Sequence, residues 1–356
     1  MIDTFIRSIG YYIPEARLTN EGVLRIFEDE NKNRISEDEL KAIIRGYKRK
    51  LEFLGSKSRS IHSDEEKDSI ANMGINAAWD AVKKAGMQPE QIECIIFTGV
   101  CNPFKEPSFA TVVARAMGLN TGDFFDINDT CNGFMKSIDL AQLYIRSGRY
   151  KNVMIATSEN PWEVLRSMNS GLELEDVKDV DNRFSLLTLG AGAAAMILSS
   201  EGDGRIIKSY ADSRESEHWD VSWVTQPYIP TPPTVYGKRV KGFWTEARGI
   251  SNTILKKMPI FINEKLQEWG GNVESIDLFI MHQLGDNVTF GILKQMNVER
   301  SKAPINTYSE IGNLASANIP INLAIAEEKG ILKSGNSVLL VGSGGGISLS
   351  LAKIEW

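Results

Sequence analysis

The chain has 356 residues, 42% of them hydrophobic, and a formal net charge of -6 at pH 7, so it can bury a large core in two domains or one fused domain. The acidic balance argues against a nucleic-acid surface, and no stretch approaches the roughly 20 consecutive apolar residues that span a bilayer. Three cysteines leave an odd count and the first residues lack the apolar segment of a secretory signal, which favours a reducing, cytoplasmic location and small-molecule or protein partners.

Helices and strands alternate along the first half of the chain. Hydrophobic periodicity predicts strands over 2–10, 92–98, 124–127 and 153–157, and helices over 36–53, 68–85 and 108–117. An acidic stretch at 162–183 contains few large apolar residues and is predicted to form a segment on the protein surface. A run at 186–198, rich in glycine and alanine, predicts a strand that another backbone or a substrate approaches closely. Four prolines within 226–233 exclude regular structure there.

Two pairs of segments indicate an internal repeat. Residues 78–100 and 262–284 share the order helix, polar turn and buried strand, and residues 185–198 are echoed by 338–351. The chain is therefore predicted to be a duplicated α/β unit whose sheets are covered by helices. We place the boundary between an N-terminal half, 1–203, and a C-terminal half, 204–356.

A cysteine stands where a polar turn leads into a helix, in the sequence Asp126-Ile-Asn-Asp-Thr-Cys131-Asn-Gly-Phe. The following helix has one apolar stripe that should pack inward, formed by Phe134, Ile138, Ala141 and Ile145. A thiol at the positive end of a helix is easier to ionise, and the thiolate is the nucleophilic form. Cys131 is therefore our candidate nucleophile. The alternative is that it is a small buried hydrophobe, as most single cysteines are.

Two further polar residues occupy positions at which the repeat predicts convergence. Of the three histidines, His62 and His218 lie in polar, charged stretches, whereas His282 ends a buried strand. Asn313 lies in a turn that enters a helix, much as Cys131 does. Each has an ordinary alternative, a strand-end histidine bonded to backbone and an Asx-turn or helix cap. These alternatives fail together if Cys131, His282 and Asn313 share one pocket.

Four separated motifs now carry a resemblance. They are Asp-Thr-Cys131-Asn-Gly-Phe, His282-Gln283, Gly312-Asn313-Leu-Ala-Ser-Ala-Asn-Ile-Pro320 and Gly342-Ser-Gly-Gly-Gly-Ile. In order and approximate spacing the chain resembles the 3-oxoacyl-acyl-carrier-protein synthase III family over nearly its full length. The resemblance implies a thiolase-like α/β fold with five layers, α/β/α/β/α, and a homodimer. It also implies a Cys131, His282 and Asn313 triad.

The loop before residue 108 departs from the pattern of housekeeping synthases III. Those enzymes place an aromatic residue ahead of Pro-Ser, and it reaches into the partner's site, whereas this chain has Phe104-Lys-Glu106-Pro-Ser. That form is more similar to OleA-type enzymes, which join two acyl chains head to head. In that branch the glutamate is a base that removes a proton beside a thioester carbonyl. The resemblance therefore implies this role for Glu106, and a solvated loop carboxylate is the alternative.

The resemblance implies a Claisen condensation through an acyl-enzyme on Cys131, which gives a 3-oxoacyl product. Backbone N–H groups of Cys131 and Gly345 would stabilise the first oxyanion, and His282 and Asn313 would stabilise the enolate. Acyl-CoA or acyl carrier protein would be the substrate, and no metal or further cofactor is expected. Housekeeping synthases grip coenzyme A with Trp and Arg, and here the basic candidates are Lys57, Arg59 and Arg248.

Other functions stay open at this point. The condensation could use a malonyl thioester and lose carbon dioxide, or the chain could be a non-condensing acyltransferase that uses an alcohol or amine. A catalytically silent partner subunit is a third possibility. An α/β-hydrolase is disfavoured because Thr-Cys131-Asn-Gly lacks the Gly-x-nucleophile-x-Gly elbow. A zinc site at Cys94 and Cys101 lacks the usual ligand spacing.

Overall fold

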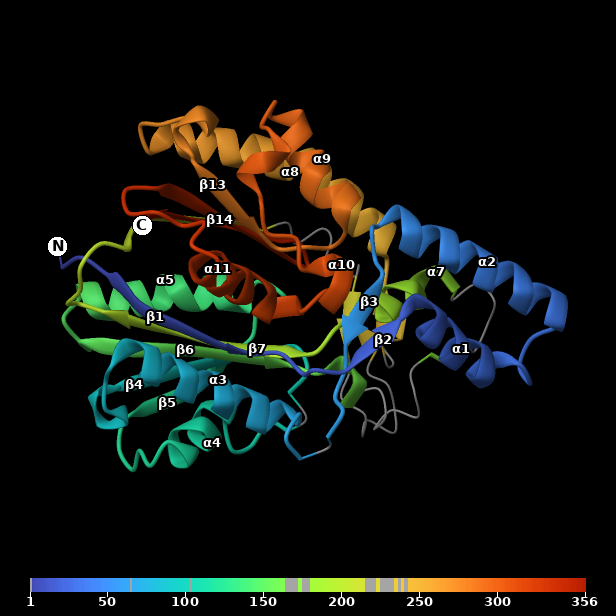
Figure 1. Ribbon diagram of the computed structural model, residues 1–356, viewed down its shortest axis with the longest axis horizontal. Helices are drawn as coiled ribbons and strands as arrows, with labels where there is room; N and C mark the ends of the chain where they lie inside the picture. The colour runs from blue at the N-terminus through green and yellow to red at the C-terminus, as the bar shows by residue number, and fades with distance from the viewer. Residues whose placement is uncertain are drawn as a thin grey trace.

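The computed structural model describes residues 2–64, 66–102, 104–163, 172–174, 180–214, 222–224, 234–235, 238–239 and 243–356. Helices and sheets alternate in five layers, which Figure 1 shows from α8 and α9 on one side to α3 and α4 on the other. The proline-rich segment 226–233 lies outside the described residues. No helix in the described ranges combines the length and the apolar character needed to cross a membrane.

The first half of the chain supplies one side of a mixed sheet. Its strands are β1 (Phe5–Tyr12), β4 (Cys94–Thr98), β5 (Asp123–Ile127), β6 (Asn152–Glu159) and β7 (Gly192–Ser199). They lie in the order β5-β4-β6-β7-β1. β4 runs parallel to both β5 and β6, whereas β7 is antiparallel to both β6 and β1.

The second half repeats this pairing. Its strands are β8 (Ile206–Arg214), β13 (Leu278–Met281), β14 (Ser337–Gly344) and β15 (Ser348–Glu355). β13 and β14 are parallel, and β15 is antiparallel to both β14 and β8. One pair, Phe5 with Ile206, joins the halves in a single sheet. The pairing therefore matches β1, β4, β6 and β7 to β8, β13, β14 and β15.

This correspondence corrects part of the expected repeat. The expected strand at 186–198 begins as a 3-10 helix, Phe184–Thr188, and only β7 matches a strand of the other half. Since β7 corresponds to β15, the first residues of the 338–351 segment, which lie in β14, have no counterpart in 185–198. The boundary at 203/204 stays a prediction and falls in the turn between β7 and β8.

Helices cover both faces of each part of the sheet. α3 (Ile70–Ala85) and α4 (Phe109–Ala116) form one outer layer, α5 (Gly133–Arg146) and α11 (Asn318–Glu328) form the central layer, and α8 (Ala247–Glu268) and α9 (Asp286–Gln295) form the other outer layer (Figure 1). Neighbouring strand residues point to opposite faces, so Ile96 packs in the central cluster with α5 and Phe97 packs with α3 and α4. The expected stripe of α5 is buried throughout.

A helical pair lies beside the layered core. It consists of α1 (Asn20–Asn31), which the sequence did not predict, and α2 (Glu37–Phe53), which begins with a Ser36–Glu39 capping box. Leu172 and Leu174 are buried against this pair, and the amide of Asn31 bonds to the backbone of both. The prediction that 162–183 is a surface segment is therefore wrong at these two leucines, which are buried. Residues 164–171 and 175–179 lie outside the described part of the chain.

The described structure also contains short helices and strands outside the layered core and the helical pair. They are β2 (Arg17–Thr19), β3 (Ser58–Ser60), α7 (Val180–Arg183), β9 (Ser222–Val224), β10 (Thr234–Val235), β11 (Lys238–Arg239), β12 (Phe243–Thr245) and α10 (Tyr308–Ile311). The other helices and strands predicted in the first half of the chain are confirmed, with ends shifted by a few residues. One end position bears on the site: α5 begins at Gly133, two residues after Cys131, and not at Cys131 itself.

Candidate active site

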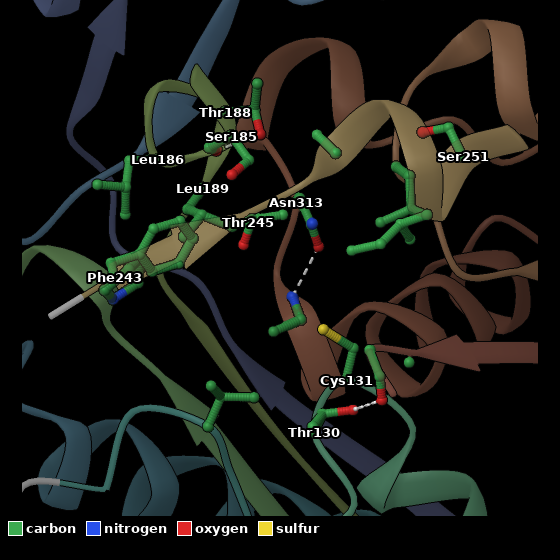
Figure 2. A pocket seen from close by; sticks show the side chains of 18 of the residues that line it. Thr130, Cys131, Ser185, Leu186, Thr188, Leu189, Phe243, Thr245, Ser251 and Asn313 are labelled. Carbon is green, nitrogen blue, oxygen red and sulfur yellow. Dashed lines mark hydrogen bonds between the residues drawn. The ribbon is translucent and has the colours of Figure 1, made fainter. Parts of the chain in front are cut away.

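One large cavity lies where the two halves meet. Its volume is about 1380 Å³, and its walls include Cys131 from the first half and His282 and Asn313 from the second. Figure 2 shows the side chains of Cys131 and Asn313 directed into the same space. The structure therefore brings together the three residues that the sequence selected, and this convergence favours a shared role over the three separate alternatives.

The turn before α5 holds Cys131 in a strained backbone arrangement. Thr130 has a φ of 50°, a left-handed conformation that costs a non-glycine residue free energy. The N–H of Asn132 bonds to the carbonyl of Asp129 at 3.0 Å, and the N–H of Gly133 bonds to the carbonyl of Thr130 at 3.2 Å. These bonds close a tight turn that has Thr130 and Cys131 at its centre. The thiol is half-buried and lines the cavity.

Glycines allow the β14–β15 hairpin to approach this turn closely. A Cβ atom on Gly344 would lie 2.4 Å from the Oγ1 atom of Thr130, and one on Gly342 would lie 2.4 Å from the Oδ1 atom of Asn132. The carbonyl of Gly345 accepts a hydrogen bond from the Thr130 hydroxyl at 3.4 Å. Gly344 and Gly345 both line the cavity, so the expected oxyanion donor at Gly345 is placed beside the nucleophile. Its function as a donor stays a prediction.

The electrostatic environment of Cys131 opposes ionisation. Burial, the charge of Glu159 and the charge of Asp129 raise the pKa of the Cys131 thiol to about 12, although a bond from its own backbone N–H acts in the other direction. The expectation that the helix end would favour the thiolate is therefore wrong. The helix begins at Gly133, and one helix terminus does not outweigh desolvation and two carboxylates. The resting residue is a thiol that needs a base.

His282 has the properties of a neutral imidazole. It follows β13, its backbone N–H bonds to the carbonyl of Val341 at 2.9 Å, and its side chain is buried. Burial lowers the pKa of His282 to about 4, so the ring is uncharged at neutral pH. Neither ring nitrogen bonds to another described residue. A neutral imidazole has one donor and one acceptor, so His282 can accept a proton or donate a bond to a ligand.

The side chain of Asn313 is fixed by its own turn. Its Oδ1 atom accepts a hydrogen bond from the N–H of Ala315 at 2.9 Å, which Figure 2 shows as a dashed line. Its backbone N–H bonds to the carbonyl of Thr188, and its carbonyl accepts a bond from the N–H of Gly190. With the oxygen engaged, the amide presents its Nδ2 hydrogens as donors to the cavity. This orientation suits an anionic oxygen.

The other predicted residues have mixed positions. Glu106 is exposed, and it is not among the described residues that line the cavity of its own chain. Lys57 is exposed away from the cavity wall, whereas Arg248, at the start of α8, lines the cavity. The structure thus brings Arg248 to the site and leaves Lys57 outside it.

Arg59 does not lie at the site either, because its guanidinium is fully buried elsewhere. It donates to the carbonyl of Leu18 at 3.0 Å and to the Oδ1 atom of Asn20 at 2.9 Å. Burial lowers the pKa of Arg59 to about 10. Its contacts join β2 and the start of α1 to β3, so the expectation that it binds substrate is corrected to a structural position. His62 is half-buried, and His218 lies outside the described residues.

Sequence reasoning missed Glu159, the last residue of β6. Its carboxyl group is buried in the cavity wall, and burial raises its pKa although several hydrogen bonds oppose this. Val153 to Ala156 form a buried apolar run, and the polar residues that follow it could have marked this strand end. In parallel strands, such ends converge on one edge of a sheet, and Glu159 therefore lies beside the end of β4.

Comparisons with known proteins find relatives that span the whole chain. The family model described as 3-Oxoacyl-[acyl-carrier-protein (ACP)] synthase III matches residues 125–214, and the model of its C terminal matches residues 266–356. A beta-ketoacyl-[acyl-carrier-protein] synthase III of Clostridium novyi is 27% identical over 100% of both chains. One of Clostridium perfringens is 30% identical over 303 residues, which are 85% of this chain and 88% of the relative.

Solved structures show the same architecture. An OleA variant of Xanthomonas campestris, solved with bound lauric acid and lauroyl-CoA, has a TM-score of 0.84 at 22% identity over 99% of both chains. The 3-oxoacyl-[acyl-carrier-protein] synthase III of Aquifex aeolicus has a TM-score of 0.80 at 24% identity over 99% of this chain and 100% of that chain. These likenesses establish the expected thiolase-like fold.

Proposed function

Since the chain belongs to the 3-oxoacyl-[acyl-carrier-protein] synthase III family and is an acyl-transferring condensing enzyme, we propose that it joins two acyl thioesters without loss of carbon dioxide. The convergence of Cys131, His282 and Asn313 on one cavity formed by both halves supports acyl transfer and condensation, and the carboxylate of Glu106 in the loop before residue 108 supports the step without loss of carbon dioxide. A nucleophile, a neutral proton acceptor and an oriented amide donor are the groups that acyl transfer and enolate formation require.

The first step is acylation of Cys131. Because the thiol is protonated at rest, His282 accepts its proton as sulfur attacks the thioester carbonyl. The backbone N–H groups of Cys131 and Gly345 stabilise the oxyanion. When this intermediate collapses, the carbon–sulfur bond of the substrate breaks and the released carrier thiolate takes the proton from His282. Acyl-Cys131 and a free carrier thiol result.

The second step makes the carbon–carbon bond. Glu106, contributed by the other subunit of a homodimer, removes a proton from the carbon beside the carbonyl of a second acyl thioester. The carbonyl oxygen of that thioester becomes an enolate oxygen, which His282 and the Nδ2 atom of Asn313 stabilise. The carbanion attacks acyl-Cys131, the Cys131 carbon–sulfur bond breaks, and a 3-oxoacyl thioester leaves. The Cys131 thiolate then takes a proton from water and Glu106 gives its proton to water, which restores the resting enzyme. The exposure of Glu106 in its own chain is compatible with a position across a subunit interface.

Charged side chains at the cavity wall indicate which group carries the acyl chain of the substrate. Lys50 on α2, Lys105 on the Glu106 loop and Arg248 on α8 all line the cavity. Lys50 is ion-paired with Asp181, and Lys105 and Arg248 are cations from two further elements that suit the phosphate groups that coenzyme A and the arm of an acyl carrier protein both have. We therefore propose that the acyl group is carried by coenzyme A or by acyl carrier protein, with Arg248 as a binding residue.

Intact-protein mass spectrometry tests the acylation step. After incubation with acyl-CoA, the wild-type chain should gain one acyl mass, and Cys131→Ala should gain none. Cys94→Ala is the matched control, because that thiol is buried in the sheet and should leave the adduct unchanged. An adduct that persists in Cys131→Ala would refute the assignment.

Glu106→Gln tests the proton-abstraction step. The variant should still form the acyl adduct but should make no 3-oxoacyl product from acyl-CoA alone. Glu90→Gln is the control and should condense normally, because Glu90 is another exposed carboxylate and lies in the short 3-10 helix Pro89–Gln91. Unchanged condensation by Glu106→Gln would remove this residue from the mechanism.

A decarboxylating reaction is the second candidate. It is favoured by the relatives named beta-ketoacyl-[acyl-carrier-protein] synthase III and by the position of Glu106 outside the cavity wall of its own chain. In that reaction, departure of carbon dioxide from a malonyl thioester creates the carbanion and no carboxylate base is needed. Strict dependence on a malonyl donor would establish this alternative.

A further inference from the structure

Glu159 is a buried carboxylate that the steps above do not use. It ends β6, its side chain is fully buried, and it lines the same cavity as Cys131. Burying a carboxylate is unfavourable unless hydrogen bonds compensate, so its partners indicate why it is there.

The partners of Glu159 come from both halves of the chain. In the first half, its oxygens accept bonds from the N–H of Val100 at 3.0 and 3.2 Å and from the N–H of Cys101 at 3.1 Å. In the second half, its Oε1 atom accepts bonds from the hydroxyl of Ser316 at 2.5 Å and from the N–H of Ser316 at 3.4 Å. One carboxylate therefore joins the loop after β4 to the turn after Asn313.

Ser316 lies in the same turn as Asn313, and the residue before it, Ala315, bonds to the Asn313 side chain. Ala315 has a φ of 45°, a conformation that an alanine adopts only when its surroundings enforce it. The N–H of this same Ala315 holds the Oδ1 atom of Asn313. We propose that Glu159 is a positioning residue that holds the 313–317 turn, and through it the Asn313 donor, against the half of the chain that carries Cys131.

Glu159 is poorly suited to be the proton-abstracting base itself. Its two oxygens already accept five bonds from three residues, so its lone pairs are occupied by donors fixed in the protein. A base needs a free lone pair directed at the substrate carbon. Its position is instead that of a clamp between two loops.

The charge of Glu159 has a second consequence at the nucleophile. Two carboxylates, Glu159 and Asp129, act with burial to raise the pKa of Cys131, and the thiol of Cys101 also faces Glu159. His282 is neutral in the same cavity and adds no charge. Loss of the Glu159 charge should therefore make Cys131 ionise at lower pH, an effect that a purely structural residue would not produce.

The test compares two variants that separate the clamp from the charge. Glu159→Gln removes the charge and leaves at least one of the facing N–H groups without an acceptor. Ser316→Ala keeps the charge and removes one bond of the clamp, together with the 2.6 Å bond between the hydroxyls of Ser316 and Thr157. Thr157→Val, which removes only that second bond, is therefore the control for Ser316→Ala. Glu163→Gln is the matched control, because it removes another carboxylate from the cavity wall whose bond goes to the N–H of Ile70 on α3.

Two readouts do not depend on the proposed function. Alkylation of Cys131 by iodoacetamide, followed by peptide mass against pH, should shift to lower pH in Glu159→Gln only. Hydrogen exchange of the 313–317 peptide should become faster in both Glu159→Gln and Ser316→Ala. Glu163→Gln should change neither. An unshifted alkylation profile in Glu159→Gln or unchanged exchange in both variants would overturn the inference. If Glu159→Gln does not fold, exchange in Ser316→Ala that is no faster than in Thr157→Val would overturn it.

A kinetic readout rests on the proposed function. Both variants should form the acyl adduct on Cys131 but condense roughly 10- to 100-fold more slowly, since small displacements of a catalytic donor have effects of that size. Equal loss in both half-reactions would contradict a specific effect on Asn313. If the wild-type enzyme makes no condensation product, the proposed function fails, while the alkylation and exchange results still decide the role of Glu159.

Discussion

The side-chain nitrogen of Asn132 donates a hydrogen bond to the hydroxyl oxygen of Ser350 at 2.6 Å, and both side chains are fully buried. Asn132 follows the nucleophile in the first half of the chain, and Ser350 lies on β15 in the second half. The position of the nucleophile turn therefore depends on a strand that lies 218 residues away in sequence.

Ser350→Ala should weaken this link. The Nδ2 atom of Asn132 would keep only its 3.3 Å bond to Asp129, and a buried donor that loses its acceptor costs about 1–3 kcal/mol of folding free energy. Urea denaturation should show that loss, and acylation of Cys131 should be slower. Ser301→Ala, at an exposed hydroxyl, should change stability by less than about 0.5 kcal/mol and serves as the control. Equal stability of both variants would contradict the role of this bond.

The pKa of His282 predicts an acid-sensitive folding free energy. Because the folded-state pKa is about 4 and the ordinary value is 6.5, the unfolded chain binds a proton that the folded chain does not bind between these values. Stability is complete above pH 6.5 and decreases as pH falls toward 4, by about 3 kcal/mol from this residue alone. His282→Asn should therefore lose less stability than the wild type between pH 7 and pH 4 in urea titrations. Parallel pH dependence of the two proteins would contradict a neutral buried ring.

Asn313→Ala should separate the two half-reactions. The variant lacks the Nδ2 donor to the enolate but keeps Cys131 and Gly345, so the acyl adduct should form at a similar rate. Condensation should fall by roughly 10²- to 10³-fold, as expected for one lost donor to a developing anion. Single-turnover mass spectrometry of adduct and product measures both rates. Slow acylation with normal condensation of the adduct would contradict the assignment.

Gly344→Ala should disturb the nucleophile turn by direct contact. The added Cβ atom would meet the Oγ1 atom of Thr130 at 2.4 Å, and something must move. We expect slower acylation and a lower melting temperature. Gly46→Ala on α2 is the control, since its Cβ atom would meet nothing within 4 Å and alanine favours a helix by roughly 1 kcal/mol. A Gly344→Ala enzyme with wild-type acylation would show that the close approach is not required.

Much of the fold was predictable because it follows from local patterns. The stripe of Phe134, Ile138 and Ile145 predicted the buried face of α5, and the structure confirms it. The convergence of Cys131 and His282 on one cavity was also predictable, because similar strand and turn patterns recur in both halves and motif order matched a known family.

The wrong predictions concern side chains whose environment is formed by residues far away in the sequence. The prediction that Cys131 ionises easily is wrong because burial, together with the charge of Glu159 at the end of another strand, raises the pKa of its thiol. The prediction that Arg59 binds substrate is wrong because Leu18 and Asn20, far away in sequence, provide buried acceptors for its guanidinium. Such contacts depend on tertiary packing, which neither periodicity nor local charge reports.

The most direct test of the proposed reaction is product analysis with a single isotopically labelled acyl-CoA as the only substrate. We expect a 3-oxoacyl product that contains two copies of the labelled chain, with no labelled carbon dioxide released in forming the thioester. A product that forms only when malonyl thioester is added, with release of its carbon dioxide, would contradict the proposed reaction and assign the decarboxylating reaction instead.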